Sequence, residues 1–433
     1  MEWERKVPET RPDGDTTGPA GAGIGRRGFL KAGTAMFVAG IAAEAVPQEI
    51  ENASKARKDA SQSNPGPENR LVQEANPNTF DPPVTDHGET PAIWNSFSVV
   101  HRRIQEGGWS RQVTVADFPL STEIAGVNMR LTAGGIRELH WHNASEWAIM
   151  LSGSARITAI DGEGRSFVRD VVKDDLWFFP SGLPHSIQGL APDGCEFLLV
   201  FDDGTFSEGN TTLISDWTRH TPMEVLAKNW GVSQDAIAPV YRQPPEGHYI
   251  FQQAVPPPLE EVLRGADAER RSLVDFTFPL HSMPPTYKTK SGEVRVIDSR
   301  NFKAPHFTIS AAHVVIHPGG LRELHWHQNA DEWQYYIAGK GRMTVFFNGA
   351  KAHTADFNAG DVGAVPRSYG HYVENTGDTD LVYLEMFKSP VFMDLSLNEW
   401  MANSPPELVM QHLGISEETL KAIPRTKTVI VPA

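Results

Sequence analysis

The chain lacks the residues that several kinds of site require. Cys195 is the only cysteine among 433 residues, so no intrachain disulfide can form, and zinc–thiolate and iron–sulfur sites are excluded. Basic residues are outnumbered, with 39 Lys and Arg against 54 Asp and Glu, which gives a formal net charge of −15. This balance argues against nucleic acid as a partner, because phosphate binding requires a basic surface.

Long hydrophobic runs are also scarce. The apolar run at about residues 32–46 is shorter than the roughly 20 residues that a membrane span needs, and no span is expected in the mature chain. The run follows Arg26-Arg27 and contains Ala43-Glu44-Ala45, a small-x-small cleavage pattern. We therefore expect residues 1–45 to be a twin-arginine signal peptide that directs export to the periplasm or the cell exterior. Residues 46–90, rich in Ser, Asn, Pro and charge, are expected to be a linker or surface wrap.

The most informative feature that is present is a repeat. The hexapeptide Arg-Glu-Leu-His-Trp-His at 137–142 recurs unchanged at 322–327, 185 positions later. Further residues match around it at an offset of 186, in the pairs Glu146 and Glu332, Gly153 and Gly339, Pro180 and Pro366, and His185 and His371. The repeat predicts two copies of one unit, which we assign to residues 91–245 and 246–433.

Each copy has the pattern of an all-β domain followed by helices. Segments 155–160 and 342–347 alternate between apolar and polar residues and lead into Asp-Gly and Asn-Gly turns. Many short strands of this kind favour a sandwich or barrel. A helical arm is expected after each barrel, beginning near Thr221 and Ser404 and ending at Gly231 and Gly414. Such arms favour a homo-oligomer, which we expect to be a trimer or hexamer.

Each copy also carries a His-x-His pair, which indicates metal chemistry. Side chains two positions apart lie on the same side of a strand, and on a barrel wall that side is the interior. The two expected ligand sets are His140, His142, Glu146 and His185, and His325, His327, Glu332 and His371. Three imidazoles and one carboxylate leave two positions open on an octahedral ion. Mn²⁺ or Fe²⁺ suits these donors, and geometry alone does not choose between them.

These residues resemble the two sequence motifs of the cupin superfamily. Segments 134–153 and 319–339 are similar to the first motif, and segments 180–185 and 360–375 to the second, although Asp174 and Ser368 replace glycines of the pattern. The resemblance covers about residues 90–425 and is closest to the bicupin oxalate decarboxylases. It implies two double-stranded β-helix (jelly-roll) barrels and two Mn²⁺ per chain. It also implies cleavage of oxalate to formate and carbon dioxide, with dioxygen as a co-catalyst that is not consumed.

The segment at 207–211 is similar to the lid of that family, a Ser-Glu-Asn-Ser-Thr loop whose Glu donates a proton. Glu208 and Thr211 match this lid, while the two middle residues differ. Formate requires the proton, because the fragment that remains when carbon dioxide leaves must gain one. Without the proton the fragment is oxidised to a second carbon dioxide, with peroxide as the other product. The altered lid therefore leaves the balance between decarboxylase and oxidase open.

The resemblance also implies roles for three further residues. Arg137 and Arg322 precede the His-x-His pairs, and a guanidinium there could hold the distal carboxylate of oxalate. The odd spacing from His140 would place Arg137 on the outer face of an unbroken strand, although the preceding Gly-Gly pair allows a bend. Glu385 interrupts an apolar strand where the first copy has Leu199, and the resemblance implies an acid beside the second metal. We expect the N-terminal site to be catalytic and the C-terminal site to support it.

Three other functions are compatible with the sequence. The nearest is an oxalate oxidase on the same scaffold, which needs no late proton donor, so Glu208 discriminates between the two. A different metal-dependent dioxygenase or isomerase would be separated by its substrate. A bicupin storage or sugar-binding protein is disfavoured, because it has no need of complete ligand sets in both copies.

The export prediction is tested by replacing Arg26 and Arg27 with Lys. The twin-arginine route carries folded proteins, so metal could be loaded before export. We expect the double variant to stay in the cytoplasmic fraction, as measured by cell fractionation. Unaltered export would contradict the prediction.

Overall fold

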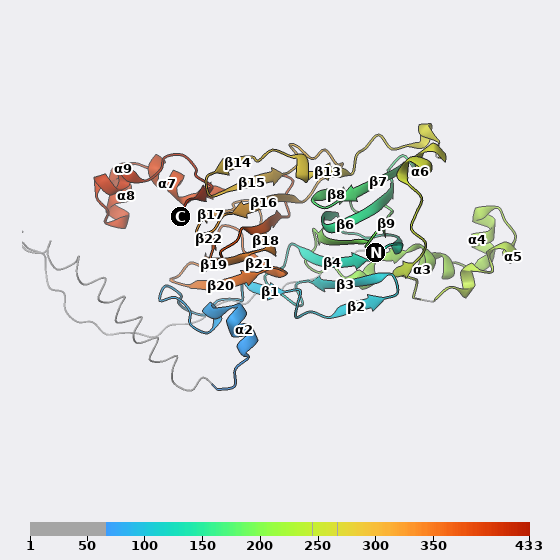
Figure 1. The fold of residues 1–433 in the computed structure, drawn as a ribbon, viewed down its shortest axis with the longest axis horizontal. Helices are drawn as coiled ribbons and strands as arrows, with labels where there is room; N and C mark the ends of the chain where they lie inside the picture. The colour runs from blue at the N-terminus through green and yellow to red at the C-terminus, as the bar shows by residue number, and fades with distance from the viewer. Residues whose placement is uncertain (1–65, 245, 266) are drawn as a thin grey trace, which may run out of the picture. The chain divides into compact units, whose positions relative to one another are not determined.

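The computed structural model describes residues 66–244, 246–265 and 267–433. The twin-arginine and cleavage patterns, and the expected linker up to residue 65, lie outside the described residues. Figure 1 shows two β-barrels, each followed by short helices. The prediction of an all-β protein with two barrels and helical arms is therefore confirmed. Among the described residues, every helix is too short or too polar to cross a membrane.

The N-terminal barrel is built from one twelve-stranded sheet. Its strands are β2 (Arg102–Gln105), β3 (Gly108–Val113), β4 (Ala125–Leu131), β5 (Gly135–Trp141), β6 (Glu146–Ile160), β7 (Ser166–Val172), β8 (Asp175–Phe179), β9 (His185–Gly189), β10 (Cys195–Phe201), β11 (Thr212–Leu213), β12 (Ile250–Gln252) and β13 (Thr277–Pro279). The long strand β6 passes through Gly153 (φ +72°) and pairs with β8 and β10 in its first half and with β7 and β9 in its second. A single strand thus joins the two faces of the barrel.

The C-terminal barrel has a seven-stranded and a six-stranded sheet. The first contains β1 (Trp94–Ser96), β14 (Tyr287–Thr289), β15 (Gly292–Ile297), β16 (Ser310–Ile316), β18 (Glu332–Ala338), β21 (Asp361–Val365) and β23 (Leu381–Phe387). The second contains β17 (Leu321–Trp326), β19 (Lys340–Phe346), β20 (Ala352–Asn358), β22 (His371–Asn375), β24 (Leu395–Ser396) and β25 (Ile430–Val431). Gly339 (φ +81°), the repeat equivalent of Gly153, lies between β18 and β19. The second barrel thus has two strands where the first has the single strand β6.

Strands cross between the two repeated units. β1 precedes the N-terminal barrel in the chain but pairs with β21 of the C-terminal barrel. β12 and β13 pair with β5 and β8 of the N-terminal barrel, so its sheet continues past the expected boundary at residue 245. The described part of the expected linker packs on β20, where Asn78 Nδ2 donates to Asp356 and Asp86 accepts from Thr354.

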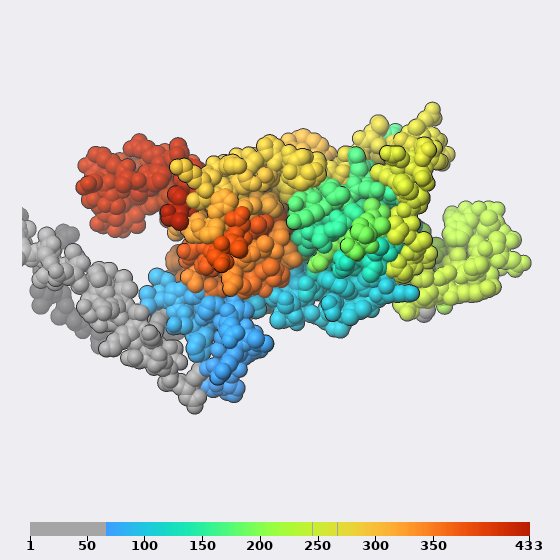
Figure 2. Space-filling view, viewed as in Figure 1, coloured from blue at the N-terminus to red at the C-terminus, as the bar shows by residue number. Residues whose placement is uncertain are grey.

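A hydrophobic core joins the barrels through equivalent strands. Side chains alternate along a strand, so Glu146 points into its barrel and the next residue, Trp147, points out. Trp147 and its repeat equivalent Trp333 belong to one buried cluster with Leu198 and Leu384. The space-filling view shows the two barrels in continuous contact (Figure 2). The strands that carry the carboxylate ligands therefore also form the contact between the barrels.

The arms are α3 (Ile214–Arg219), α4 (Met223–Trp230) and α5 (Gln234–Ile237) after the first barrel, and α7 (Leu397–Asn403), α8 (Pro406–Leu413) and α9 (Glu417–Ala422) after the second. Gly231 and Gly414 end α4 and α8 in the left-handed conformation, as predicted. We expected Thr221 and Ser404 to cap these helices, and this is wrong, because the N-caps are Pro222 and Pro405 and neither forms a side-chain cap bond. The base of the first arm is fixed by the Glu138 carboxylate, which accepts from the backbone N–H of Ser215 at 2.8 Å.

Candidate metal centres

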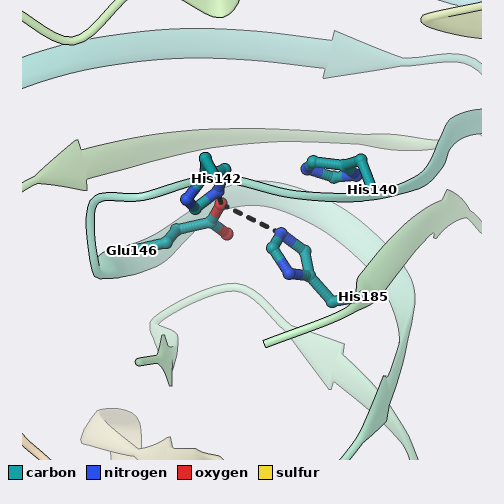
Figure 3. A group of neighbouring side chains, drawn as sticks. All are labelled: His140, His142, Glu146 and His185. Carbon is teal, nitrogen blue, oxygen red and sulfur yellow. Dashed lines mark hydrogen bonds and ion pairs between the residues drawn. The ribbon is translucent and has the colours of Figure 1, made fainter. Parts of the chain in front are cut away.

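The first predicted ligand group comes together inside the N-terminal barrel. His140 and His142 lie at the end of β5 and beyond it, Glu146 begins β6, and His185 begins β9. The ligand atoms of all four residues lie within 4.8 Å of one another, and all four side chains are buried. Figure 3 shows the rings of His142 and His185 turned toward the Glu146 carboxylate, at 3.1 and 3.3 Å from Oε2.

The second group repeats this arrangement in the C-terminal barrel. His325, His327, Glu332 and His371 are buried with their ligand atoms within 4.8 Å. The Nε2 atoms of His327 and His371 lie 3.0 and 2.7 Å from Glu332 Oε2. The strand register is the same in both barrels, since His140 faces His185 and His325 faces His371.

Backbone carbonyls set the tautomers of the histidines. Nδ1 of His140 lies 2.5 Å from the Glu138 carbonyl, and Nδ1 of His185 lies 2.7 Å from the Leu183 carbonyl. His142, His325, His327 and His371 have corresponding contacts at 2.6–3.0 Å. A carbonyl only accepts, so each Nδ1 carries the proton and each Nε2 turns a lone pair toward the centre of its group.

Both groups fit a divalent ion. Metal–ligand bonds of roughly 2.1 Å at right angles separate neighbouring ligand atoms by about 3 Å, which matches the observed spacings. The Nε2 atoms of His185, His325, His327 and His371 and Oε2 of Glu332 are buried without a hydrogen-bond partner among the described residues. Burial and the Arg137 charge hold the pKa of His140 well below its usual value, so its imidazole stays neutral. Lone pairs that converge on a carboxylate in this way provide the donor set of a divalent cation.

Arg137 lies on the same side as the ligands because β5 contains a bulge. Arg137 pairs with Ile187 and His140 with His185, so three steps along β5 match two steps along β9. The extra residue restores the inward direction that an odd spacing would lose. The same bulge lies between Arg322 and His325. Arg137 therefore has the inward orientation that the resemblance implies, and the bulge that produces it lies after Arg137 and not at the preceding Gly-Gly pair.

The two arginines differ in their partners. The guanidinium of Arg137 donates to the Tyr249 carbonyl at 3.2 Å and lies 4.0 Å from the centre of the Tyr249 ring. Its Nε has no partner among the described residues. Burial lowers the pKa of Arg137, and Glu208 and Glu146 offset this only in part. A buried charge without a paired acid costs on the order of several kcal/mol, so this position is suited to an anion.

Arg322, in contrast, is paired with two acids, and only its Nη1 has no hydrogen-bond partner among the described residues. Its Nε donates to Glu385 Oε1 at 3.0 Å and its Nη2 to Asp394 Oδ2 at 2.7 Å. Burial opposes the charge, but these two acids raise the pKa of Arg322 well above its usual value. Asp394 is also paired with Lys427, and Arg322 and Lys427 overcome burial to lower the pKa of Asp394 to about 2. Arg322 therefore has little capacity to hold a further anion.

Glu208 faces the first group from the segment after β10. It opens a short 3₁₀ helix, Glu208–Asn210, which Ser207 caps and Thr211 ends. Glu208 is only 8% exposed, and its Oε2 has no hydrogen-bond partner among the described residues. Burial raises the pKa of Glu208, against the opposing pull of Arg137 and His142. Thr211 is buried, with a hydroxyl that is likewise unpaired in the described part of the chain.

Three residues near the groups were missed in the sequence. Asp394 stands 186 positions after Glu208, the offset that relates Glu146 to Glu332, so the alignment of the copies could have indicated it. Tyr249 is fixed by the Glu138 carboxylate, which accepts from its backbone N–H at 2.9 Å. Trp177 donates to Glu146 Oε1 at 2.8 Å. No sequence signal singles out Tyr249 or Trp177.

Comparisons with known proteins agree with this geometry. The Cupin family model matches residues 98–238 and 278–421. Oxalate decarboxylase OxdC of Bacillus subtilis is 47% identical over 366 residues, which are 84% of this chain and 93% of that protein. A probable oxalate decarboxylase of Arthroderma benhamiae is 37% identical and covers 84% of this chain and 89% of its own length.

A solved structure of the Bacillus subtilis oxalate decarboxylase, studied for its Mn(II) centres, superposes with a TM-score of 0.81 at 46% identity and covers 85% of this chain and 96% of that chain. The match extends over both barrels, and each barrel carries a complete ligand group. Within the cupin family, the chain therefore belongs to the bicupin oxalate decarboxylases, which are carboxy-lyases.

Proposed function

We propose that this chain is a manganese-dependent oxalate decarboxylase that converts oxalate to formate and carbon dioxide at the N-terminal centre. The observation that carries the proposal is the proximity of an unpaired guanidinium, Arg137, and a buried carboxyl, Glu208, to one ligand group. Three curated relatives named oxalate decarboxylases support the choice of substrate.

Manganese is the ion that suits the nitrogen and oxygen donors of both ligand groups, and it is also the ion studied in a solved relative. His140, His142, Glu146 and His185 would hold one ion, and His325, His327, Glu332 and His371 the other. Nitrogen and oxygen donors without sulfur suit Mn²⁺, and the solved relative has Mn(II) centres. A bound Mn²⁺, with dioxygen as co-catalyst, would supply one-electron chemistry and a Lewis acid for the oxygens of oxalate.

Arg137 would hold the distal carboxylate of oxalate. Its guanidinium is buried, charged and free of a paired acid, so it can form two parallel hydrogen bonds to a carboxylate. The Tyr249 carbonyl and ring keep it in place before substrate binds. Such prior orientation lowers the cost of stabilising the charge that develops as the carbon–carbon bond breaks.

Glu208 would supply the proton that makes formate. When carbon dioxide leaves, the remaining carbon must gain a proton, and a carboxyl group with a raised pKa retains one to donate. The unpaired Glu208 oxygen is itself buried, so the proton would be donated out of contact with bulk water. Thr211 would hold the end of this lid segment in place.

The C-terminal centre would have a supporting role. Glu385 and Asp394 neutralise Arg322, and the acid that follows β23 is therefore engaged in an ion pair. Without a free guanidinium and a free acid, that centre lacks both groups that decarboxylation needs. His327 packs against Phe387 and Phe392 of the second barrel's core, which supports a role of this centre in stabilising that barrel.

The products from purified, manganese-loaded protein test the proposed function. We expect one formate and one carbon dioxide for each oxalate consumed, without net consumption of dioxygen. Formate is measured by enzymatic assay, carbon dioxide by mass spectrometry and peroxide by a peroxidase-coupled dye. Two carbon dioxides and one peroxide for each oxalate would replace the proposal with the oxidase.

Glu208→Gln should lower the rate of formate production by about 100-fold or more, the usual contribution of a general acid, while manganese content is unchanged. In the wild type, the ratio of formate to oxalate consumed should fall as pH rises through the raised pKa of Glu208, because the group then loses its proton. The ratio is used because ionisation of oxalate does not affect it.

The matched control is Asp203→Asn. Asp203 is an exposed acid in the same segment, and its carboxylate accepts from the backbone and hydroxyl of Thr205. This variant should keep the wild-type ratio at every pH. If formate production survives in Glu208→Gln, the proton donor is another group.

A further inference from the structure

A cavity lies outside the N-terminal centre, on the far side of the lid segment. It encloses about 270 Å³ and is lined by Arg103 of β2, Arg111 and Gln112 of β3, and the lid residues Ser207, Glu208 and Gly209, among others. Glu208 thus borders this cavity while its carboxyl is also affected by Arg137, His142 and Glu146. The Glu208 side chain therefore both lines the cavity and lies close enough to the N-terminal centre to be affected by its charges.

The cavity has an excess of unpaired positive charge. Arg111 donates to the amide oxygen of Asn128 and the carbonyl of Phe97, both at 2.9 Å, and neither acceptor carries a charge. The only other carboxylate in the lining besides Glu208 is Asp117, which accepts from the backbone N–H and hydroxyl of Thr114. Among the described residues, neither Arg103 nor Arg111 lies within ion-pair distance of an acid.

Arg103 and Arg137 share one aromatic ring. The Arg103 guanidinium lies 3.7 Å from the centre of the Tyr249 ring, and that of Arg137 lies 4.0 Å from it. The ring is held by its hydroxyl, 3.0 Å from Ser110 Oγ, and by its backbone N–H, which donates to Glu138. Burial and the nearby Arg137 charge lower the pKa of Arg103, whereas Glu208 raises it. Two like charges are thus held against one ring, and Glu208 is the carboxyl group that affects both.

This arrangement favours binding of an anion. Stacking occupies the face of the Arg103 guanidinium and leaves its N–H edge available for the two oxygens of a carboxylate. Arg103 itself is exposed on β2, the edge strand of its sheet, so an anion from solvent can reach it. Arg137 is buried behind the same ring, so an anion at Arg103 lies one side chain away from the inner guanidinium.

We propose that Arg103, assisted by Arg111, forms an outer binding site that captures oxalate in the lid cavity and delivers it past Glu208 to Arg137. The inference rests on the proposed function for the identity of the anion. Arg103 is a positioning residue, since it acts before the substrate reaches the metal ligands. It also raises the local concentration of a dianion around a protein whose net charge is −15, which would otherwise repel it.

The test compares Arg103→Gln with wild-type holoenzyme and with Arg102→Gln. Arg102 is the adjacent exposed arginine on β2, and its guanidinium lies over Trp109 and does not line the cavity. We expect Arg103→Gln to raise the KM for oxalate about tenfold, the effect of losing one charge-assisted contact, with kcat within about twofold. The KM should also depend less on salt concentration, and Arg103→Lys should recover most of the loss. Arg102→Gln should keep the wild-type KM.

Two readouts separate this inference from the proposed function. Oxalate consumption is measured separately from formate production. The KM of each variant can therefore be determined even if the enzyme is an oxidase that makes no formate. Stopped-flow mixing of oxalate with each holoenzyme without dioxygen, followed by tryptophan fluorescence, measures the association rate even if no turnover occurs, and Arg103→Gln should associate about tenfold more slowly. A wild-type association rate in Arg103→Gln would overturn the outer site, as would an equal loss in Arg102→Gln. Manganese content and circular dichroism confirm that each variant is folded.

Discussion

The extra residue that β5 inserts between Arg137 and His140 is the constraint on which the N-terminal centre depends. It turns Arg137 and the histidines to the same side of one strand. It also buries Glu138, whose carboxylate accepts from the backbone of Ser215, His248 and Tyr249. Tyr249, fixed in this way, supplies the carbonyl that holds Arg137. The bulge therefore orients the guanidinium and also builds the support that keeps it oriented.

The same bulge in the second barrel leads to a different result because the surrounding acids differ. Arg322 lies between Glu385 and Asp394, whereas the residue that matches Glu385 in the first copy is Leu199. The acid after β10 is Glu208, which does not lie within ion-pair distance of Arg137. Glu208 is buried, and among the described residues its Oε2 has no hydrogen-bond partner. Equal ligand groups thus have unequal surroundings, and this difference underlies our assignment of the chemistry to the N-terminal centre.

Much of this could be predicted from the sequence, since the repeat identifies both ligand groups and the alternation of strand residues turns each His-x-His pair inward. The orientation of Arg137 could not be derived, because spacing alone does not reveal a bulge and gives the opposite face. The exchange of β1 and β13 between the barrels was also hidden, because the pairing of such short strands is decided by distant partners. Tyr249 lies far from every motif, and only the folded chain shows that it contacts both Arg103 and Arg137.

The central claim is that two equivalent ligand groups do unequal work, and paired histidine substitutions test it most directly. His140 and His325 occupy the same register in their barrels. His140→Ala and His325→Ala are each purified, and bound manganese and the rate of formate production are measured on the same samples. The account predicts that each variant loses about one of two metal ions, and that formate production is lost only in His140→Ala. Formate production that survives in His140→Ala, or is lost in a folded His325→Ala that keeps its N-terminal metal, would contradict the account.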